Sequence, residues 1–469
     1  ALLNRGRESY LRSRGLPPGS LGVRASLRAI VDRNFYRRQL ERHGPVFKTA
    51  QFHNGVVCVA GLDRGRELLT RHREALAPPP LALSDAIPRG FLRYMSVADH
   101  ERYSPLFRAA FSEPVFDAHR DFAREQAVAG LERLARGGGE AGGQPAEAVR
   151  SYVGTTLTRI FFGRAFSADD ARRIEHLVER ARGEDAAGGA SRELRRTVAD
   201  FAHLLVAATR SAGADSGPSV WSRLVAASPE LVDDATVHGN LFALWVAAED
   251  SVRGVLVWMA RFLAADPRWI EGLRERAARG DRGEDVGRAG GERDLATRLV
   301  LETLRLAQSE YVYRRVLEPI EVDGFRVPAG WMVRILVAES HRSDPPFGHP
   351  DRFDPDRHLG SSLGPSEFAP LGLDHHTCLG AGLTLWMGRV FARAAARYDW
   401  QIVADGPPQR GNRHWMHWAP SSELRVRLVP VGAGLTPSAA VAAGASVPAA
   451  EAVERGFRTG AGGSTPPGP

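Results

Sequence analysis

The chain contains very little cysteine and lysine. Cys58 and Cys378 are the only cysteines among its 469 residues, which excludes a disulfide framework and any cysteine-rich zinc or iron–sulfur site. We therefore expect a reducing, cytoplasmic setting. Lys48 is the only lysine, so the formal net charge of +7 is carried almost entirely by arginine. This bias, together with abundant alanine and glycine, indicates a GC-rich bacterial genome.

Long apolar runs and basic runs are also missing. No stretch of 18 apolar residues occurs, so we predict no transmembrane helix. Residues 1–22 are rich in arginine and lack the apolar core of a signal peptide, and we expect no membrane anchor. The arginines lie beside carboxylates in every segment, which argues against nucleic-acid binding and leaves open a basic face for an acidic protein partner.

Hydrophobic periodicity predicts one large, mainly α domain with a small β region. We expect an N-terminal extension over residues 1–22, a single domain over 23–431, and a disordered low-complexity tail over 432–469. The helical pattern runs from about 64 to 316. The other predicted elements are a short sheet at 47–62, a long helix near 233–264, a strand pair at 320–327 around Asp323-Gly324, a strand at 331–337, a helix at 379–400, and a strand at 423–429.

The most informative segment is Phe368-Ala-Pro-Leu-Gly-Leu-Asp-His-His-Thr-Cys378-Leu-Gly380. It runs into an apolar helical pattern, so Cys378 is predicted to lie at a helix start, where free N–H groups and the helix dipole favour a thiolate. A lone thiolate can be the axial ligand of a haem iron. Cys58, by contrast, lies in the early sheet and is interpreted as a small buried hydrophobic residue.

The long helix carries Ala247-Ala248-Glu249-Asp250-Ser251. An acid followed by a hydroxyl, in mid-helix and among apolar residues, is costly to bury without partners. Such a pair can deliver protons, or it can lie on a solvated helix face. Taken alone, the motif favours the second interpretation.

Three arginines and a carboxylate precede the Cys378 segment. Glu302 and Arg305 are spaced i, i+3 and therefore share a helix face. Arg357 closes Phe353-Asp-Pro-Asp-Arg357 and can complete a buried Glu–Arg–Arg network. Arg315 lies ten residues after Arg305, just before the predicted hairpin.

The order of these motifs resembles that of the cytochrome P450 family, over roughly residues 17–430. The resemblance implies that Cys378 is the proximal ligand of haem b (iron protoporphyrin IX), with Gly380 beside it. Glu302, Arg305 and Arg357 form the structural triad behind the haem. The remaining implied roles are haem propionate binding by His100, Arg315 and His376, and proton delivery by Asp250 and Ser251.

Five positions depart from the family pattern. Leu371 replaces the usual Phe, and Asp374 the usual Gly, in the Cys378 segment. Ala248 and Ser251 replace the usual Gly and Thr of the oxygen-binding helix, and Ser104 replaces an Arg four residues after His100. These changes indicate unusual tuning of the haem, or a reaction other than simple hydroxylation.

Glu310, Tyr311 and Val312 follow the Glu-x-x-Arg helix, in the stretch that faces the substrate in this family. With Ala247 and Ala248 they are the candidate substrate contacts. Glu310, Tyr311 and the neighbouring Tyr313 make this wall polar, which suggests a hydrogen-bonding or amine-bearing substrate. The alternative is that Glu310 pairs with Arg314 or another nearby arginine.

The resemblance implies a soluble bacterial monooxygenase that oxidises a small organic molecule in specialised metabolism, such as antibiotic biosynthesis. It would use O₂ and electrons from a ferredoxin or flavodoxin and its reductase, and we expect a monomer. The alternatives are a peroxide-using, coupling or rearranging haem-thiolate enzyme, and a haem-binding protein without oxygenase activity. A zinc site from His375, His376 and Cys378, or a cysteine nucleophile activated by His376, leaves the upstream motifs unexplained.

Overall fold

The structure is a computed structural model of the 469-residue chain. It describes residues 15–431 except 52–53, 80, 164–167, 185–191, 213–216, 280–292, 309, 344–345, 361–362, 374–376 and 411–417. The chain divides into a unit spanning residues 1–429 and a C-terminal unit beginning at Pro430. The fold below is that of the first unit, and the predicted tail at 432–469 lies outside the described residues.

A five-stranded mixed sheet forms the β part of this unit. Its order is β1 (Val46–Gln51), β2 (Asn54–Ala60), β7 (Met332–Leu336), β4 (Tyr311–Val316) and β3 (Leu76–Ala77). β2 and β7 run parallel and the other neighbours are antiparallel. Three strand pairs lie apart from it: β5 (Ile320–Val322) with β6 (Phe325–Val327), β8 (Tyr398–Ala404) with β11 (Arg425–Pro430), and β9 (Gln409–Arg410) with β10 (Trp418–Ala419).

The rest of the described chain is mainly helical, which confirms the predicted fold class. The longer helices are α2 (Val23–Val31), α3 (Phe35–His43), α4 (Leu62–Arg71), α6 (Val97–Ala110), α8 (Arg120–Gly138), α9 (Pro145–Phe162), α10 (Ala168–Glu184), α11 (Arg192–Ala212), α12 (Val220–Ala227), α13 (Ala235–Ala265), α14 (Arg268–Ala278), α15 (Leu295–Thr303) and α17 (Ala381–Ala395). The shorter turns are α5 (Ala82–Asp85), η1 (Leu92–Tyr94), α7 (Glu113–Asp117), η2 (Gly139–Ala141), η6 (Pro229–Asp233), the π-helical η7 (Leu304–Gln308), α16 (Val337–Ser340) and η8 (Pro355–His358).

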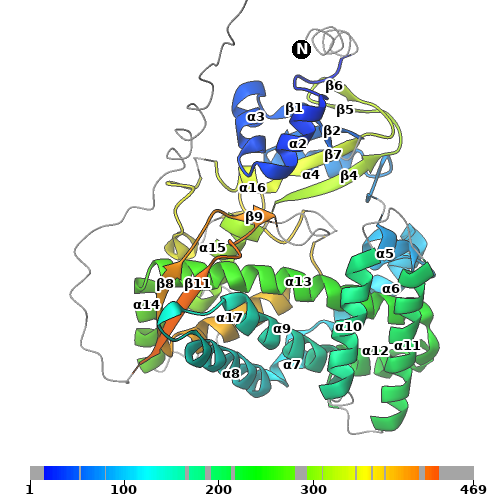
Figure 1. The fold of residues 1–469 in the computed structure, drawn as a ribbon. Coiled ribbons are helices and arrows are strands. Elements are labelled where there is room, and N and C mark those ends of the chain that lie inside the picture. Colours follow the sequence, from blue (N-terminus) through cyan, green and yellow to red (C-terminus); the bar gives the residue numbers. More distant parts are fainter. Residues whose placement is uncertain are drawn as a thin grey trace, which may run out of the picture. The chain divides into compact units, whose positions relative to one another are not determined.

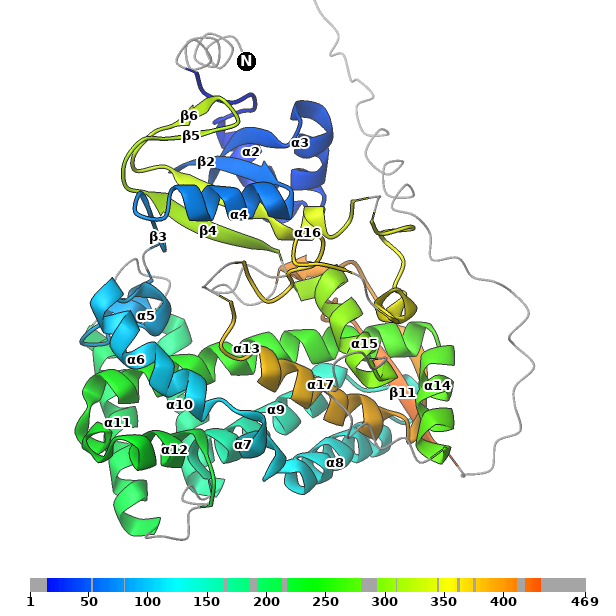
Figure 2. The same cartoon turned by 180° about the vertical axis from the view of Figure 1, so that it is seen from behind.

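Helices cover both faces of the sheet. Phe35 and Tyr36 of the α2–α3 pair pack with Cys58 on one face, and Leu68 and Leu69 of α4 pack on the other. Figures 1 and 2 show these two layers, with α2 and α3 in front of the sheet in one view and α4 in front in the other. The alternating side chains of β1 and β2 explain why both faces are apolar.

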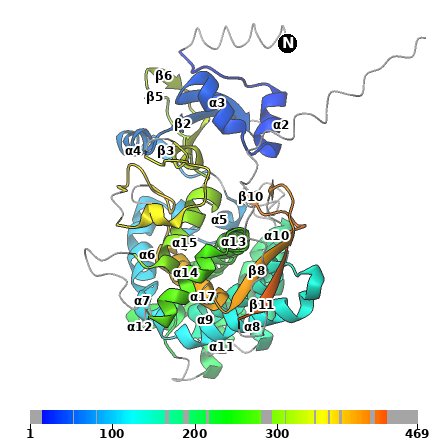
Figure 3. The same cartoon turned by 90° about the vertical axis from the view of Figure 1, so that its left-hand side faces the viewer.

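The hairpin at 320–327 forms as predicted. Asp323 (φ +48°) and Gly324 (φ +76°) both adopt left-handed backbone conformations between β5 and β6. A two-residue hairpin loop of this kind needs positive φ at both positions, which Asp-Gly tolerates. The helix expected at 379–400 ends at Ala395 instead, and β8 follows it, paired with β11 as Figure 3 shows. Tyr398 and Trp400 are buried there while Asp399 is exposed, which is the alternation of a strand.

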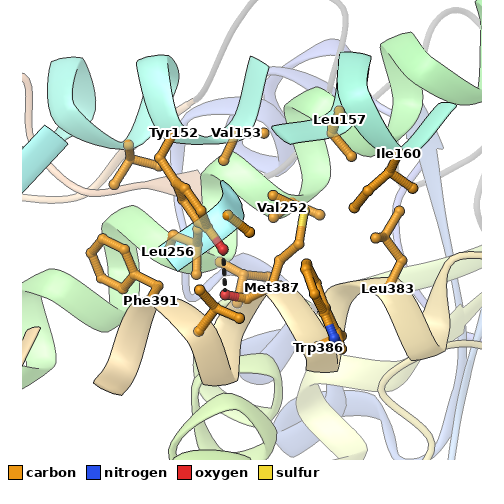
Figure 4. Close-up of a cluster of buried hydrophobic side chains, with 14 of the residues drawn as sticks. Tyr152, Val153, Leu157, Ile160, Val252, Leu256, Leu383, Trp386, Met387 and Phe391 are labelled. Atoms are coloured by element: carbon orange, nitrogen blue, oxygen red, sulfur yellow. Dashed lines mark hydrogen bonds between the residues drawn. The ribbon is translucent and has the colours of Figure 1, made fainter. Parts of the chain in front are cut away.

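The main core fixes α17 against α9 and α13. Tyr152 of α9 donates a hydrogen bond from its hydroxyl to the carbonyl of Met387 (3.0 Å), and its ring lies 6.1 Å from that of Phe391. Val252 and Leu256 of α13 complete this cluster, as Figure 4 shows. The helix that follows Cys378 is therefore held directly to the helix that carries the acid–hydroxyl pair.

Helices α17 and α15 also lie very close together. A methyl group placed on Gly388 of α17 would overlap the Val300 side chain of α15. A glycine here brings the two helices together more closely than any larger residue allows.

Candidate functional site

The Cys378 segment is closed by backbone hydrogen bonds. The Cys378 N–H donates to the Leu371 carbonyl (2.7 Å), and the Ala381 N–H donates to the Cys378 carbonyl (3.2 Å). Gly372, beside Leu371, has φ +106° and supplies the left-handed turn that this closure needs. Leu373 is buried among the apolar side chains under α4, whereas Leu371 and Leu379 pack against the main helical core. The segment is thus anchored on both sides of the cysteine.

Two opposing effects act on the pKa of the Cys378 thiol. Cys378 is exposed, yet desolvation by the surrounding atoms raises the pKa of the thiol above its ordinary value. The Gly380 N–H, which hydrogen bonds to the thiol, and the charge of Arg93 both act to lower that pKa. The backbone N–H near the helix start therefore lowers the thiol pKa as predicted, but desolvation raises this pKa by more in the haem-free protein.

The second cysteine is in a different environment. Cys58 is fully buried in β2, and burial raises the pKa of its thiol strongly. It packs with Phe47 and Leu336 as a small apolar residue. Within the described ranges, no three His, Cys, Asp or Glu side chains are grouped so that they would hold a metal ion. His375 and His376, the other members of the alternative zinc site, lie outside those ranges, as does Asp374.

Glu302, Arg305 and Arg357 are brought together in a buried network. Arg305 donates from Nε and Nη2 to the two carboxylate oxygens of Glu302, at 2.8 Å each. Arg357 Nε donates to Glu302 Oε1 at 3.0 Å. His358 lies 3.0 Å from Glu302 Oε2 and was not predicted from the sequence. A carboxylate with two guanidinium partners is well compensated for its burial.

Burial alone would raise the pKa of Glu302, but its partners outweigh it. Hydrogen bonds from Arg305 and His358, the charge of Arg305 and the Asp354 N–H lower that pKa to about 2. Arg305 also donates to the carbonyls of His341 (2.8 Å), Pro350 (2.7 Å) and Arg352 (3.1 Å). The network therefore ties α15 to the irregular stretch that precedes the Cys378 segment.

His341 links this stretch to the Cys378 segment itself. Its Nε2 accepts a hydrogen bond from the Ala369 N–H at 3.0 Å. Burial first, and then the charges of Arg305, Arg342 and His358, lower the pKa of His341 to about 3. The imidazole is therefore neutral, as an acceptor at Nε2 must be.

The two carboxylates of the acid–hydroxyl motif in α13 are paired with an arginine of the same helix. Arg253 pairs with Glu249 (3.2 Å) and with Asp250 (3.1 Å). This partner, three and four residues further along α13, explains how two adjacent carboxylates are accommodated in a largely buried helix. The proton-delivery role of Asp250 and Ser251 stays a prediction.

One face of α13 is less buried than its surroundings. Leu244, Ala247, Ala248 and Ser251 are all half-buried, while their neighbours Trp245, Val246, Glu249 and Val252 are buried. The four positions are spaced i, i+3, i+4 and i+7, which places them on one helix face. Ala247, Ala248 and Ser251 were all chosen from the sequence, and their contact with a substrate stays a prediction.

Strand β4 separates the two arginines that follow the triad helix. Arg315 is exposed, on the same strand face as Tyr311 and Tyr313. Arg314 is buried on the opposite face, with Val312 and Val316. Those two valines belong to the apolar cluster that contains Ala369 and Leu373 of the Cys378 segment. Arg314, which the sequence motif did not select, is therefore the arginine on the side of the cysteine.

The stretch from η1 to the first turn of α6 contains the predicted propionate ligand His100 and the cation Arg93. His100 is half-buried in its first turn, and Ser104, one turn later, accepts a hydrogen bond from Arg108 Nε at 3.2 Å. Arg93 in η1 is the cation whose charge acts on Cys378. Asn240 of α13 holds η1 in place by accepting from the Leu92 N–H (2.7 Å).

The three candidates after the triad helix have different surroundings. Glu310 accepts from Arg410 Nη1 (3.2 Å) and from the Trp418 N–H (2.7 Å). The predicted pairing of Glu310 with an arginine is thus present, with Arg410 in place of Arg314. Tyr311 stacks under Arg334, and Val312 is buried on the other strand face.

The sequence and the fold of this chain are similar to those of cytochromes P450. Residues 221–424 match the family model for cytochrome P450. Abscisic acid 8'-hydroxylase 1 of Arabidopsis thaliana is 31% identical over 181 residues, which cover 37% of this chain and 38% of that protein. The same-named rice protein (Oryza sativa subsp. japonica) is 30% identical over 179 residues, covering 36% and 38%. The chain thus matches under half the length of these curated relatives.

Solved structures share the fold over most of the chain. The cyanobacterial CYP120A1 with retinoic acid bound has a TM-score of 0.71 at 19% identity, covering 89% of this chain and 99% of that one. A zebra fish cytochrome P450 with progesterone has a TM-score of 0.66 at 16% identity, covering 84% and 98%. The chain therefore has the fold of the cytochromes P450, and its residues 221–424 match the model of that family. In the part of the chain that the structure describes, no helix is both long and apolar enough to span a bilayer.

The residues present fit the haem-thiolate group that this family implies. The exposed Cys378 would supply the thiolate that binds the iron, and the Gly380 N–H hydrogen bonds to its sulfur. Arg93 acts electrostatically on Cys378 and Arg314 is buried in β4, and guanidinium groups suit partly buried propionates. His376, a predicted propionate ligand, lies outside the described residues.

Proposed function

We propose that the protein is a haem-thiolate monooxygenase that oxidises a small organic substrate. The observation that carries the proposal is the exposed Cys378, in a segment that His341 links to the Glu302–Arg305–Arg357 network. Haem b, when bound, supplies the activation of O₂ and the insertion of one oxygen atom into the substrate. The Arabidopsis and rice relatives are named for hydroxylation of abscisic acid, and we extend hydroxylation as a reaction class to this chain.

The chain's own residues then have distinct tasks. Cys378 binds the iron, and the Gly380 N–H stabilises the charge on the sulfur. Arg93, Arg314 and His100 hold the propionates, with Arg314 in place of the exposed Arg315. The half-buried face of α13 at Ala247, Ala248 and Ser251 contacts the substrate, and Ser251 with Asp250 moves protons toward it.

Electrons come from outside the chain in this proposal. Its sequence carries no flavin or nicotinamide fingerprint, so a ferredoxin or flavodoxin with its reductase supplies them. The net positive charge of the chain, which is carried almost entirely by arginine, suits an acidic partner of this kind. The setting that we propose is the cytoplasm of a bacterium that makes specialised metabolites.

The ferrous–CO spectrum tests the haem-thiolate assignment. Wild-type holoprotein is expected to show the red-shifted band of a thiolate-ligated haem, and Cys378→Ser to lose it. Cys58→Ala is the matched control, because the only other cysteine is buried in the sheet and its variant should keep the band. A wild-type spectrum without the red-shifted band would leave a haem-binding protein of another type.

One observation favours a second reaction. Asp250 is held by Arg253 at 3.1 Å, which restricts its use as a proton carrier and adds to the departures at Ala248 and Ser251. A peroxide-using enzyme needs less proton delivery from this helix. Turnover with hydrogen peroxide, together with no turnover with ferredoxin and reductase, would select it.

A further inference from the structure

Helix α2 presents an apolar stripe to the solvent. Val23, Leu27 and Val31 are 74%, 57% and 72% exposed, and their i, i+4, i+8 spacing places them on one face of the helix (Figure 1). The other six exposed large apolar residues of the described chain are spread over five segments, so α2 carries the largest group of them. The proposed haem site does not use this face.

The opposite face of α2 holds the helix to the fold. Ala29 is fully buried, and Ala25 packs against the same apolar cluster. Each lies two residues from Leu27, and two residues correspond to about 200° of rotation in an α-helix. A surface helix of a globular protein normally turns its larger apolar side chains inward. In α2 the small alanines point inward, which leaves the valines and the leucine for a second contact.

The flank of the stripe is cationic. Arg24 and Arg28 each follow a residue of the stripe and are exposed, and α2 contains no acid. Residues 1–31 hold six arginines and a single acid, Glu8. Aliphatic side chains beside guanidinium groups are complementary to a surface that is apolar inside and negatively charged outside.

The size of α2 distinguishes between two kinds of partner. A helix of nine residues is about 14 Å long. Its exposed face is therefore far smaller than the roughly 800 Å² that each side of a stable protein interface buries. The stripe also contains no Trp or Tyr, which are enriched in the hot spots of protein interfaces. A bilayer surface needs neither feature, because it adapts to a short helix and accepts aliphatic side chains between its headgroups.

We propose that α2 binds peripherally to a membrane surface rich in anionic lipid. The three aliphatic side chains of the stripe enter the boundary between headgroups and acyl chains, and Arg24 and Arg28 contact the lipid phosphates. The binding is reversible, because three aliphatic side chains bury little area compared with a spanning helix. The proposal goes beyond the oxidation reaction and requires neither a bound substrate nor turnover.

Sedimentation of the full chain with lipid vesicles tests the proposal, and the fraction of protein in the pellet is the readout. The wild type should bind phosphatidylcholine vesicles more strongly when they contain phosphatidylglycerol, and high salt should reduce the difference. The double variant Arg24→Gln/Arg28→Gln should bind the anionic vesicles about thirtyfold more weakly, since each arginine near such a surface contributes about fivefold. Its binding to neutral vesicles should equal that of the wild type.

Leu27→Gln should weaken binding to both kinds of vesicle about tenfold, because it removes the central aliphatic side chain of the stripe. Leu317→Gln is the matched control, since Leu317 is a leucine outside α2 that is 44% exposed, and it should bind as the wild type does. All these variants change exposed side chains and should keep the wild-type melting temperature.

Two results of the sedimentation experiment would overturn the proposal. Phosphatidylglycerol would fail to increase binding, or Leu27→Gln would bind as Leu317→Gln does. Light scattering without lipid provides a third test. A dimer that Leu27→Gln dissociates would also overturn the proposal, because a second copy of the chain would then cover the stripe.

Discussion

Glu302 and Arg305 form a bidentate ion pair in which neither side chain has any solvent exposure. Both oxygens of the carboxylate are used, and one of them is shared with Arg357. Removing one partner of such a buried pair leaves an uncompensated charge, which costs far more than the net value of the pair.

Glu302→Gln should therefore lower the free energy of unfolding by about 3 kcal/mol. Urea denaturation followed by circular dichroism measures it. Glu67→Gln is the control, because Glu67 and Arg71 are exposed and 4.0 Å apart, and its loss should be near zero. A loss below about 1 kcal/mol for Glu302→Gln, the range of surface pairs, would contradict the buried network.

His341 should make stability depend on pH. Its pKa in the folded protein, about 3, lies below the ordinary value of 6.5, so its contribution is complete above pH 6.5 and is lost as the pH falls toward 3. By pH 4 the loss is of the order of 3 kcal/mol. His341→Gln keeps an acceptor for the Ala369 N–H and should lose less stability between pH 7 and pH 4. Urea unfolding at several pH values tests this, with the exposed His203→Gln as control; equal slopes for both variants would refute it.

Gly388→Ala should destabilise the protein by about 2 kcal/mol, because its methyl group overlaps Val300 and forces α15 and α17 apart. Gly137→Ala in α8 is the matched control, since nothing lies within 4 Å of its added methyl group and alanine is the better helix former. The melting temperature should fall for the first variant and stay or rise for the second. Equal shifts would show that the close helix contact is absent.

Arg93 should control the reactivity of Cys378 in haem-free protein. The exposed Cys378 is expected to react with iodoacetamide while the buried Cys58 does not. Arg93→Gln removes the charge that lowers the thiol pKa, so alkylation at neutral pH should slow severalfold. Arg71→Gln, remote in sequence and exposed, should leave the rate unchanged. Mass spectrometry of the labelled peptide measures both rates.

Local patterns in the sequence correctly predicted the elements that depend on residues close together in the chain. The Asp323-Gly324 hairpin, the long helix from Ala235 to Ala265, and the early sheet all formed. Glu302 and Arg305 were found because i, i+3 spacing on a helix determines their proximity. Arg357 could be proposed as their partner only through the family order, since 52 residues separate it from Arg305.

The missed residues have no such local signal. Arg314 and Arg315 are adjacent, and only the pairing of β4 with β7 determines which of them is buried. His358 and His341 meet the triad through the irregular stretch, whose course no periodicity reveals. The helix predicted to reach residue 400 was too long because the strand pairing of Tyr398–Ala404 depends on residues 425–430, far along the chain.

The π-helical turn at Leu304–Gln308 sets the direction in which the side chains before and after it point. A π turn contains one residue more than an α turn, and one residue corresponds to about 100° of rotation about a helix axis. Arg305 can thus point into the triad while the Leu306 carbonyl accepts from Arg33 and Arg342. Deleting one residue from this turn would rotate Glu310 by that angle relative to Glu302. The Glu302–Arg305 pair and the Glu310–Arg410 pair could then no longer form at the same time.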